Sequence, residues 1–239
     1  MATNQTDRPA PRTAGWDIAY VLGTLYAIKY SFLQVPMLWA YAGPVSLLTA
    51  TAVATWRLHR NRESWADLGL RMPASVWKML GWSLAALIAT VIAGIVIGSG
   101  LPLLLGDASA PIDPRYAGRF ANVPGNLAPY LFWVATAWIV GAFAEEMLFR
   151  AMLISRFERV FATLPFAVPI AVILQSVIFG QQHHYYQGLT GALATGAIAL
   201  VSGAIYIVLK RGLWPLILSH GTANMIGLTM IYVGAQPPG

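Results

Sequence analysis

The sequence predicts an all-α polytopic membrane protein, a bundle of about seven transmembrane helices. Of its 239 residues, 57% are hydrophobic and only 10% are charged, whereas a soluble domain carries about 25% charged residues. Mean hydropathy is +0.62. The net charge of +6 and a pI near 9.8 would also suit nucleic-acid binding. However, the basic residues cluster in short connections between apolar runs, which is typical of cytoplasmic loops. We therefore expect a lipid bilayer, and no nucleic acid, among the partners.

Seven apolar stretches are long enough to be transmembrane helices, and polar connections, prolines or glycines separate them. The predicted spans are 17–34, 38–56, 79–105, a helix that begins at 127 and ends before 165, 165–182, 189–209 and 213–233. Lys29 lies within the first stretch, which is therefore either a weak span or a tilted interfacial helix whose lysine snorkels. The break between the fifth and sixth spans, around residues 185–188, would lie within the bilayer. Such a break is tolerated only beside a water-filled cavity.

The connections between the spans predict how the protein lies in the membrane. The stretches 57–78, 156–159 and 210–211 are basic, and we expect them in the cytoplasm together with the amino terminus. The 107–125 connection has balanced charge and should lie on the other side. No apolar core precedes a small-residue cleavage site near the amino terminus, so no cleaved signal peptide is predicted. We expect an integral, multi-pass protein of a bacterial inner membrane or an equivalent membrane.

The chain shows no internal repeat and divides into four parts. They are a polar amino-terminal tail (1–15), amino-terminal transmembrane helices and loops (16–126), a transmembrane core (127–233) and a carboxyl-terminal tail (234–239). The core contains most of the ionisable groups that interrupt apolar helices, and it therefore carries the functional prediction.

Two adjacent carboxylates and an arginine interrupt the apolar fourth span. No charged residue occurs between Pro129 and Ala144, but Glu145 and Glu146 follow directly, and Arg150 comes one turn later. Ionisable groups at such depth are costly, so they usually pair inward and mark a function. At about 100° per residue, Glu146 and Arg150 share a face, whereas Glu145 points elsewhere. We predict that Glu146 and Arg150 neutralise each other and that Glu145 is free for chemistry.

Later spans contribute two histidines and an asparagine. Phe179 precedes His183 by one helical turn and Asn224 follows His220 by one turn, so each pair shares a helix face. Taken singly, each group has a structural explanation, such as an interfacial histidine or an asparagine that links helices. Together, a carboxylate, two imidazoles and an amide form a hydrolytic set. The carboxylate takes a proton from water, an imidazole helps to hold that water, and the amide stabilises the oxyanion.

The predicted helix lengths allow these side chains to meet at one level in the membrane. With a rise of about 1.5 Å per residue, Glu145 and His183 are nearly level if the fourth and fifth spans form a hairpin that turns near residues 162–163. His220 reaches the same level if this hairpin projects into the cytoplasm by about half its length. We therefore predict a polar cavity between the later helices that opens towards the cytoplasm.

Three motifs, in the same order on consecutive spans, resemble the signatures of the CAAX-protease and bacteriocin-processing (CPBP) family of intramembrane proteases, also called the Abi family. The motifs are Glu145-Glu146-x-x-x-Arg150, Phe179-x-x-x-His183 and His220-x-x-x-Asn224, and Gly180 and Leu213-Trp214-Pro215 also look like that family. The resemblance covers residues 127 to about 228. Eukaryotic members, the CAAX prenyl endopeptidases, remove the last three residues of prenylated proteins.

The resemblance implies an intramembrane endopeptidase that acts on a membrane-embedded or lipidated protein or peptide, either a prenylated CAAX-type substrate or a small peptide. Carried over by motif position, it implies that Glu145 is the catalytic carboxylate and His183 its partner on the water. His220 would be the third member and Asn224 the oxyanion donor. The motif selects His183, although its neighbour His184 could substitute. Residues in supporting positions would be Glu146, Arg150 and Phe179.

The sequence leaves open whether a metal takes part. The family is often labelled a metalloprotease family, and a divalent metal such as zinc would have Glu145, His183 and His220 as its ligands. The chain has no cysteine, which excludes disulfides, thiolate catalysis and cysteine-ligated zinc. The alternative to an enzyme is a membrane scaffold, immunity or transport-like protein that keeps the polar cluster for packing or binding.

Overall fold

The computed structural model describes residues 10–105 and 113–234 of the chain. Within these two stretches every regular element is a helix, so the predicted all-α helix bundle is confirmed. Three predicted segments fall partly outside the described residues: the tail 1–15 at residues 1–9, the connection 107–125 at 107–112, and the tail 234–239 at 235–239.

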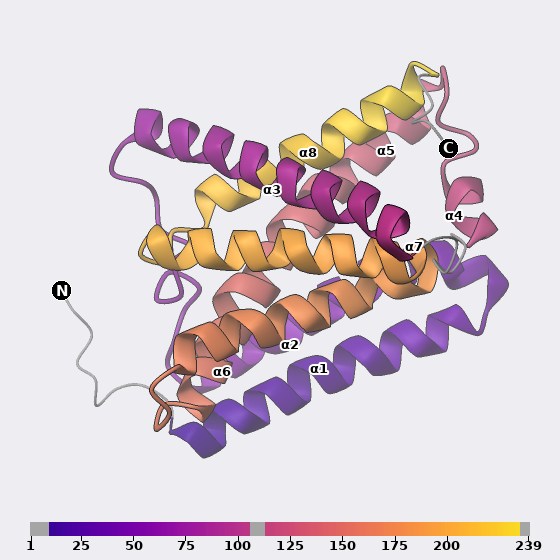
Figure 1. The fold of residues 1–239 in the computed structure, drawn as a ribbon. Helices are drawn as coiled ribbons and strands as arrows, with labels where there is room; N and C mark the ends of the chain where they lie inside the picture. Colours follow the sequence, from indigo (N-terminus) through magenta and orange to yellow (C-terminus); the bar gives the residue numbers. More distant parts are fainter. Residues whose placement is uncertain (1–9, 106–112, 235–239) are drawn as a thin grey trace.

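The helices of the described residues are shown in Figure 1. Their bounds are α1 (Pro11–Leu33), η2 (Pro36–Tyr41), α2 (Ala42–Arg60), α3 (Val76–Leu105), α4 (Pro114–Arg119), α5 (Leu127–Thr136), η4 (Ala137–Ala144), η5 (Glu146–Leu153), α6 (Ile154–Val160), α7 (Ala167–Val208) and α8 (Trp214–Tyr232). The elements α5, η4, η5 and α6 form one long helix, Leu127–Val160, whose middle is π-helical. Such π segments are rare and often occur at functional sites. Helices long and apolar enough to cross a membrane are Pro36–Arg60, Val76–Leu103, Leu127–Val160 and Ala167–Val208.

The element α7 consists of two antiparallel helices joined at a sharp corner (Figure 1). Gly188 forms the corner with φ 65° and ψ −168°, a backbone conformation that favours glycine. Beyond the corner the helix returns along itself, since Gln175 Nε2 donates to the carbonyl oxygen of Ala199 at 3.0 Å. The halves pack so closely that a Cβ on Gly180 would lie 2.4 Å from the carbonyl oxygen of Ala192. With α7 counted as two helices, the long helices agree with the predicted seven, and the predicted break occurs at Gly188.

Helix α1 lies along the outside of the bundle and buries one face against it, formed by Ala14, Asp17, Val21, Leu25 and Lys29. It covers 23 residues, begins at Pro11, and lies along α2 and near α6 (Figure 1). Lys29 is only 2% exposed, and its Nζ donates to the carbonyl oxygen of Gln182 on α7 at 2.6 Å. Of the alternatives for this stretch, snorkelling of Lys29 is excluded, because α1 turns the lysine towards a buried hydrogen-bond acceptor on α7.

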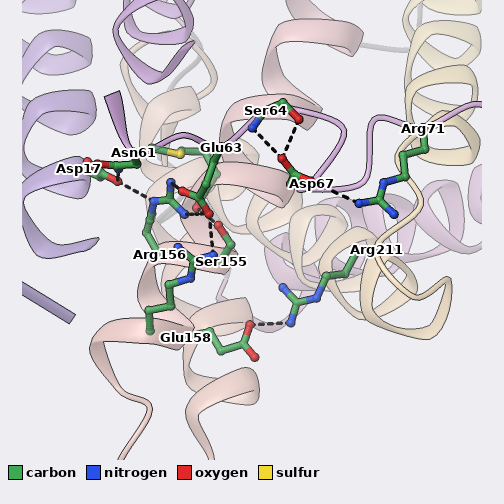
Figure 2. A network of polar contacts seen from close by, with 12 residues as sticks. Asp17, Asn61, Glu63, Ser64, Asp67, Arg71, Ser155, Arg156, Glu158 and Arg211 are labelled. Carbon is green, nitrogen blue, oxygen red and sulfur yellow. Dashed lines mark hydrogen bonds and ion pairs between the residues drawn. The ribbon is translucent and has the colours of Figure 1, made fainter. Parts of the chain in front are cut away.

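Buried ion pairs join the helices at the end of the bundle where the basic connections lie (Figure 2). Asp17 of α1 is fully buried and accepts hydrogen bonds from Arg57 Nε at 2.6 Å and from Arg156 Nε at 2.7 Å. Glu63, in the connection after α2, pairs with both Arg156 and Arg159. We call these five residues the basic-end network. It joins α1, α2 and α6, and each of its carboxylates contacts two guanidinium groups.

Candidate active site

A cavity of about 440 Å³ lies within the bundle, and all four residues predicted to be catalytic line it. They are Glu145, His183, His220 and Asn224. The Leu127–Val160 helix, α7 and α8 supply them, as the order of the motifs predicts. The predicted location between the later helices was nevertheless incomplete, because α1, α2 and α4 also contribute to the wall.

Glu146 is the buried centre of an electrostatic cluster. Its side chain is 1% exposed, and its Oε2 lies 3.1 Å from Arg150 Nε in the ion pair that the i,i+4 spacing predicts. Its Oε1 also accepts a hydrogen bond from His220 Nδ1 at 2.9 Å. Because a carboxylate can only accept, Nδ1 of His220 carries the proton and Nε2 is the ring atom left for chemistry. Glu146 therefore orients His220 as well as neutralising Arg150.

Glu145 borders the cavity next to the same imidazole. Its carboxylate Oε2 lies 3.9 Å from His220 Nε2, too far for a direct hydrogen bond but suited to a water held between them. The two adjacent glutamates thus reach opposite nitrogens of one histidine ring. Glu146 uses Nδ1, and Glu145 faces Nε2.

His183 is held by its own helix. Its Nδ1 donates to the carbonyl oxygen of Phe179 at 2.8 Å, so its Nε2 is an acceptor. The ring packs on that of Phe179, with centroids 4.7 Å apart. The neighbouring His184 is exposed and does not line the cavity. The geometry therefore distinguishes the two histidines in favour of the one that the motif selects.

The Phe179 side chain connects the three motifs. It is 3% exposed, and the guanidinium of Arg150 lies 4.6 Å from its ring centroid, within the range of a cation–π contact. Its ring centroid is also 6.5 Å from that of His220. A single aromatic ring thus lies against the Arg150 guanidinium and near both histidines, which makes Phe179 a positioning residue.

Two glycines let α8 approach the Leu127–Val160 helix. The ring of Trp138 lies flat against Gly221, where a Cβ would be 2.3 Å from two ring carbons. On the facing helix, a Cβ on Gly141 would lie 2.9 Å from Asn224 Nδ2. Close approach at these points brings His220 and the Asn224 amide to the level of the carboxylates.

The cavity lies at the end of the bundle opposite the basic-end network. Its lining includes Lys29 near the end of α1, Gly43 near the start of α2, Tyr116 of α4 and Ile231 near the end of α8. The sequence predicts an opening on the side of the basic connections, whereas these lining residues lie at the other ends of their helices. His183 lies five residues before the corner of α7 at Gly188 and lines the same cavity as Glu145.

Sequence reasoning did not assign two cations of this wall, Lys29 and Arg119. Lys29 was noted only as an unusual charge in a span. Arg119 belongs to a connection rich in polar residues, where an arginine carries no signal of its own.

The side chains do not fit a metal site in this arrangement. Within residues 10–105 and 113–234, no three His, Cys, Asp or Glu side chains are grouped closely enough to hold a metal ion. Glu146 engages Nδ1 of His220 and a backbone carbonyl engages Nδ1 of His183, so Nε2 of each ring is left for water or another ligand.

Fold and cavity together define a polytopic helical membrane protein with a buried cluster of carboxylates and imidazoles. Residues 127–226 match the family described as type II CAAX prenyl endopeptidase Rce1-like. The match covers the segment that carries the three motifs, and it confirms the resemblance inferred from them. Comparison with curated proteins gave no match, and comparison with solved structures gave none.

Proposed function

We propose that this protein is an intramembrane endopeptidase in which Glu145 and His183 activate a water molecule. The family match supports a membrane protease in general terms. The observation that carries the specific proposal is that Glu145, His183, His220 and Asn224, supplied by three separate motifs, line one cavity of about 440 Å³.

The proposed reaction uses these side chains and one water molecule. Glu145 takes a proton from the water that His183 Nε2 orients, and the resulting hydroxide attacks the carbonyl carbon of the peptide bond. The carbonyl oxygen becomes an oxyanion, to which the Asn224 amide donates a hydrogen bond. Glu145 then returns the proton to the leaving amine as the C–N bond breaks. His220, held by Glu146 through Nδ1, presents Nε2 as an acceptor for a water that lies between this nitrogen and Glu145.

The substrate that we propose is a membrane-associated chain, either a prenylated protein of the CAAX type or a small peptide. The test incubates the purified protein with a short peptide that carries a prenylated cysteine followed by three apolar residues. Mass spectrometry identifies the products. Cleavage by the wild type and none by Glu145→Gln supports the proposal. No cleavage by the wild type of any prenylated or unprenylated peptide would favour the scaffold, immunity or transport-like alternative.

We also propose an orientation in which the basic end of the bundle lies in the cytoplasm and the cavity end on the other side. The cysteine-free chain allows a matched test with two exposed alanines, Ala66 in the basic connection and Ala117 on α4. A membrane-impermeant thiol reagent should label Ala117→Cys in intact cells and Ala66→Cys only after permeabilisation. The reverse pattern would place the cavity on the cytoplasmic side.

A further inference from the structure

Two cations, Lys29 and Arg119, share one part of the cavity wall without a carboxylate partner. Among the described residues neither forms an ion pair, whereas the basic-end network pairs every buried carboxylate with arginine. Tyr185 joins the two, because Lys29 Nζ lies 4.4 Å from its ring centroid and Arg119 Nη2 lies 3.4 Å from its hydroxyl. All three residues line the cavity that contains Glu145.

Aromatic rings cover the guanidinium of Arg119. Its central carbon lies 5.2 Å from the ring centroid of Trp39, 5.4 Å from that of Tyr186 and 5.8 Å from that of Trp133. The Nε atom is buried and has no hydrogen-bond partner among residues 10–105 and 113–234. Buried N–H groups are nearly always paired, so an unpaired one next to a cavity is a place for an acceptor from a ligand. The planar edge of a guanidinium matches the two oxygens of a carboxylate.

Lys29 adds a second donor with uncompensated charge. Its ammonium group donates to two neutral oxygens of Gln182, the carbonyl oxygen at 2.6 Å and Oε1 at 2.9 Å. An ammonium group has three donors, so one is left for a ligand. Neutral oxygens hold the side chain in position without cancelling its charge.

The carboxylate that caps α4, Asp113, pairs with the other arginine of this helix and not with Arg119. Asp113 pairs with Arg115, whose Nη2 lies 2.7 Å from Asp113 Oδ2. The hydrogen bonds from Arg115 hold the pKa of the Asp113 carboxyl below its usual value, so this pair stays ionised and satisfied. Helix α4 therefore carries two arginines in opposite situations: Arg115 is exposed and paired, and Arg119 faces the cavity unpaired.

We propose that Lys29 and Arg119 form an anion subsite that binds a carboxylate of the peptide substrate. The inference rests on the proposed function, because it names what the same cavity would recognise. A peptide offers this group either as its free terminal carboxylate or as an acidic side chain. A lipid phosphate is disfavoured because Lys29 is 2% exposed and rings cover the guanidinium, so that only a small planar group can approach along its edge.

The test measures binding rather than turnover. Three versions of one prenylated peptide are titrated into purified Glu145→Gln protein: a free terminal carboxylate, a terminal carboxamide, and a carboxamide with an added glutamate. Tryptophan fluorescence reports binding, since Trp39 and Trp133 lie against Arg119. We expect at least one carboxylate peptide to bind about tenfold or more tightly than the plain carboxamide, as charge-assisted bidentate hydrogen bonds require. The preferred version identifies the source of the carboxylate.

Variants then assign the preference to the subsite. Arg119→Gln should bring the ratio of affinities close to one, and Arg119→Lys, which keeps the charge but loses the planar edge, should leave part of it. Arg115→Gln is the matched control on the same helix and should keep the full ratio. Thermal unfolding confirms that each variant is folded.

Several outcomes overturn the inference. They are equal affinity for all three peptides, no binding at millimolar concentration, and a preference that survives Arg119→Gln. Stabilisation by anionic lipid that depends on Arg119, without any carboxylate preference, would assign the cations to a phosphate headgroup instead. Hydrolysis by the wild type is measured separately and decides the proposed function, so that the two can fail independently.

Discussion

Exchanging each of the two adjacent glutamates for glutamine should separate catalysis from stability. Glu145 lies at the cavity and has no ion pair shorter than the 3.9 Å approach of His220. Glu146 is buried against Arg150 at 3.1 Å and against His220 at 2.9 Å. Glutamine is nearly isosteric with glutamate but carries no charge and cannot act as a base at neutral pH.

The contacts set the expected magnitudes. In Glu146→Gln, Arg150 loses its counter-ion while 0% exposed, and its charge cannot be removed by deprotonation. Breaking a buried pair from one side costs about 3–5 kcal/mol. At about 2–4 °C per kcal/mol for a chain of this size, the melting temperature should fall by roughly 6–20 °C. Glu145→Gln leaves no buried charge without a counter-ion, so the melting temperature should change by no more than about 3 °C. Its hydrolysis should fall by about 10²–10⁴-fold or more, because the general base is gone.

Both properties are measured on both variants, melting by tryptophan fluorescence of the purified protein and hydrolysis with the prenylated peptide. The double variant Glu146→Gln/Arg150→Gln is a further control, which should recover much of the lost stability because no lone buried charge remains. The assignment of roles is refuted if Glu145→Gln cleaves at a rate near that of the wild type. It is equally refuted if Glu146→Gln melts like the wild type and is inactive.

Two further predictions test the helix approach and the basic end. Gly141→Ala places a methyl group 2.9 Å from Asn224 Nδ2 and should lower the hydrolysis rate by about 10–100-fold, because it displaces the amide, with little change in melting temperature. Gly227→Ala is the control, because a methyl group there meets no atom within 4 Å and should leave the rate unchanged. Equal rates for the two variants would contradict this role of Gly141. Asp17→Asn removes the carboxylate that two arginines share and should lower the free energy of unfolding by about 3–5 kcal/mol. The folded variant should keep the hydrolysis rate of the wild type. The exposed pair made by Asp67 should matter by less than about 1 kcal/mol when Asp67→Asn is measured as control.

Much of the fold is predictable from the sequence because its signals are local. Apolar runs mark the helices, and the glycine at 188 marks the corner of α7, since an abrupt reversal needs a backbone conformation that favours glycine. The pairing of Glu146 with Arg150 follows from helical spacing alone. The location of the four motif residues around one cavity also agrees with their order on consecutive spans.

The rest depends on how helices face one another, which spacing does not determine. Helical periodicity correctly separates Glu145 from Glu146, yet it gives no hint that His220, 74 residues away, lies between them. The inward direction of Lys29 depends on an acceptor on α7. Arg119 was missed because its aromatic neighbours come from different elements, so no local pattern marks it.

The distribution of buried charge gives a final argument that the cavity binds a polar ligand. At the basic end, Asp17 and Glu63 each contact two arginines, as expected where buried charge serves stability. At the cavity, a carboxylate and two cations face the same space without forming pairs among the described residues, although pairing would lower the free energy of the folded protein. Stability alone would favour replacing Lys29 and Arg119 by apolar side chains. Their presence beside Glu145 is explained if the partner that compensates them arrives with the substrate.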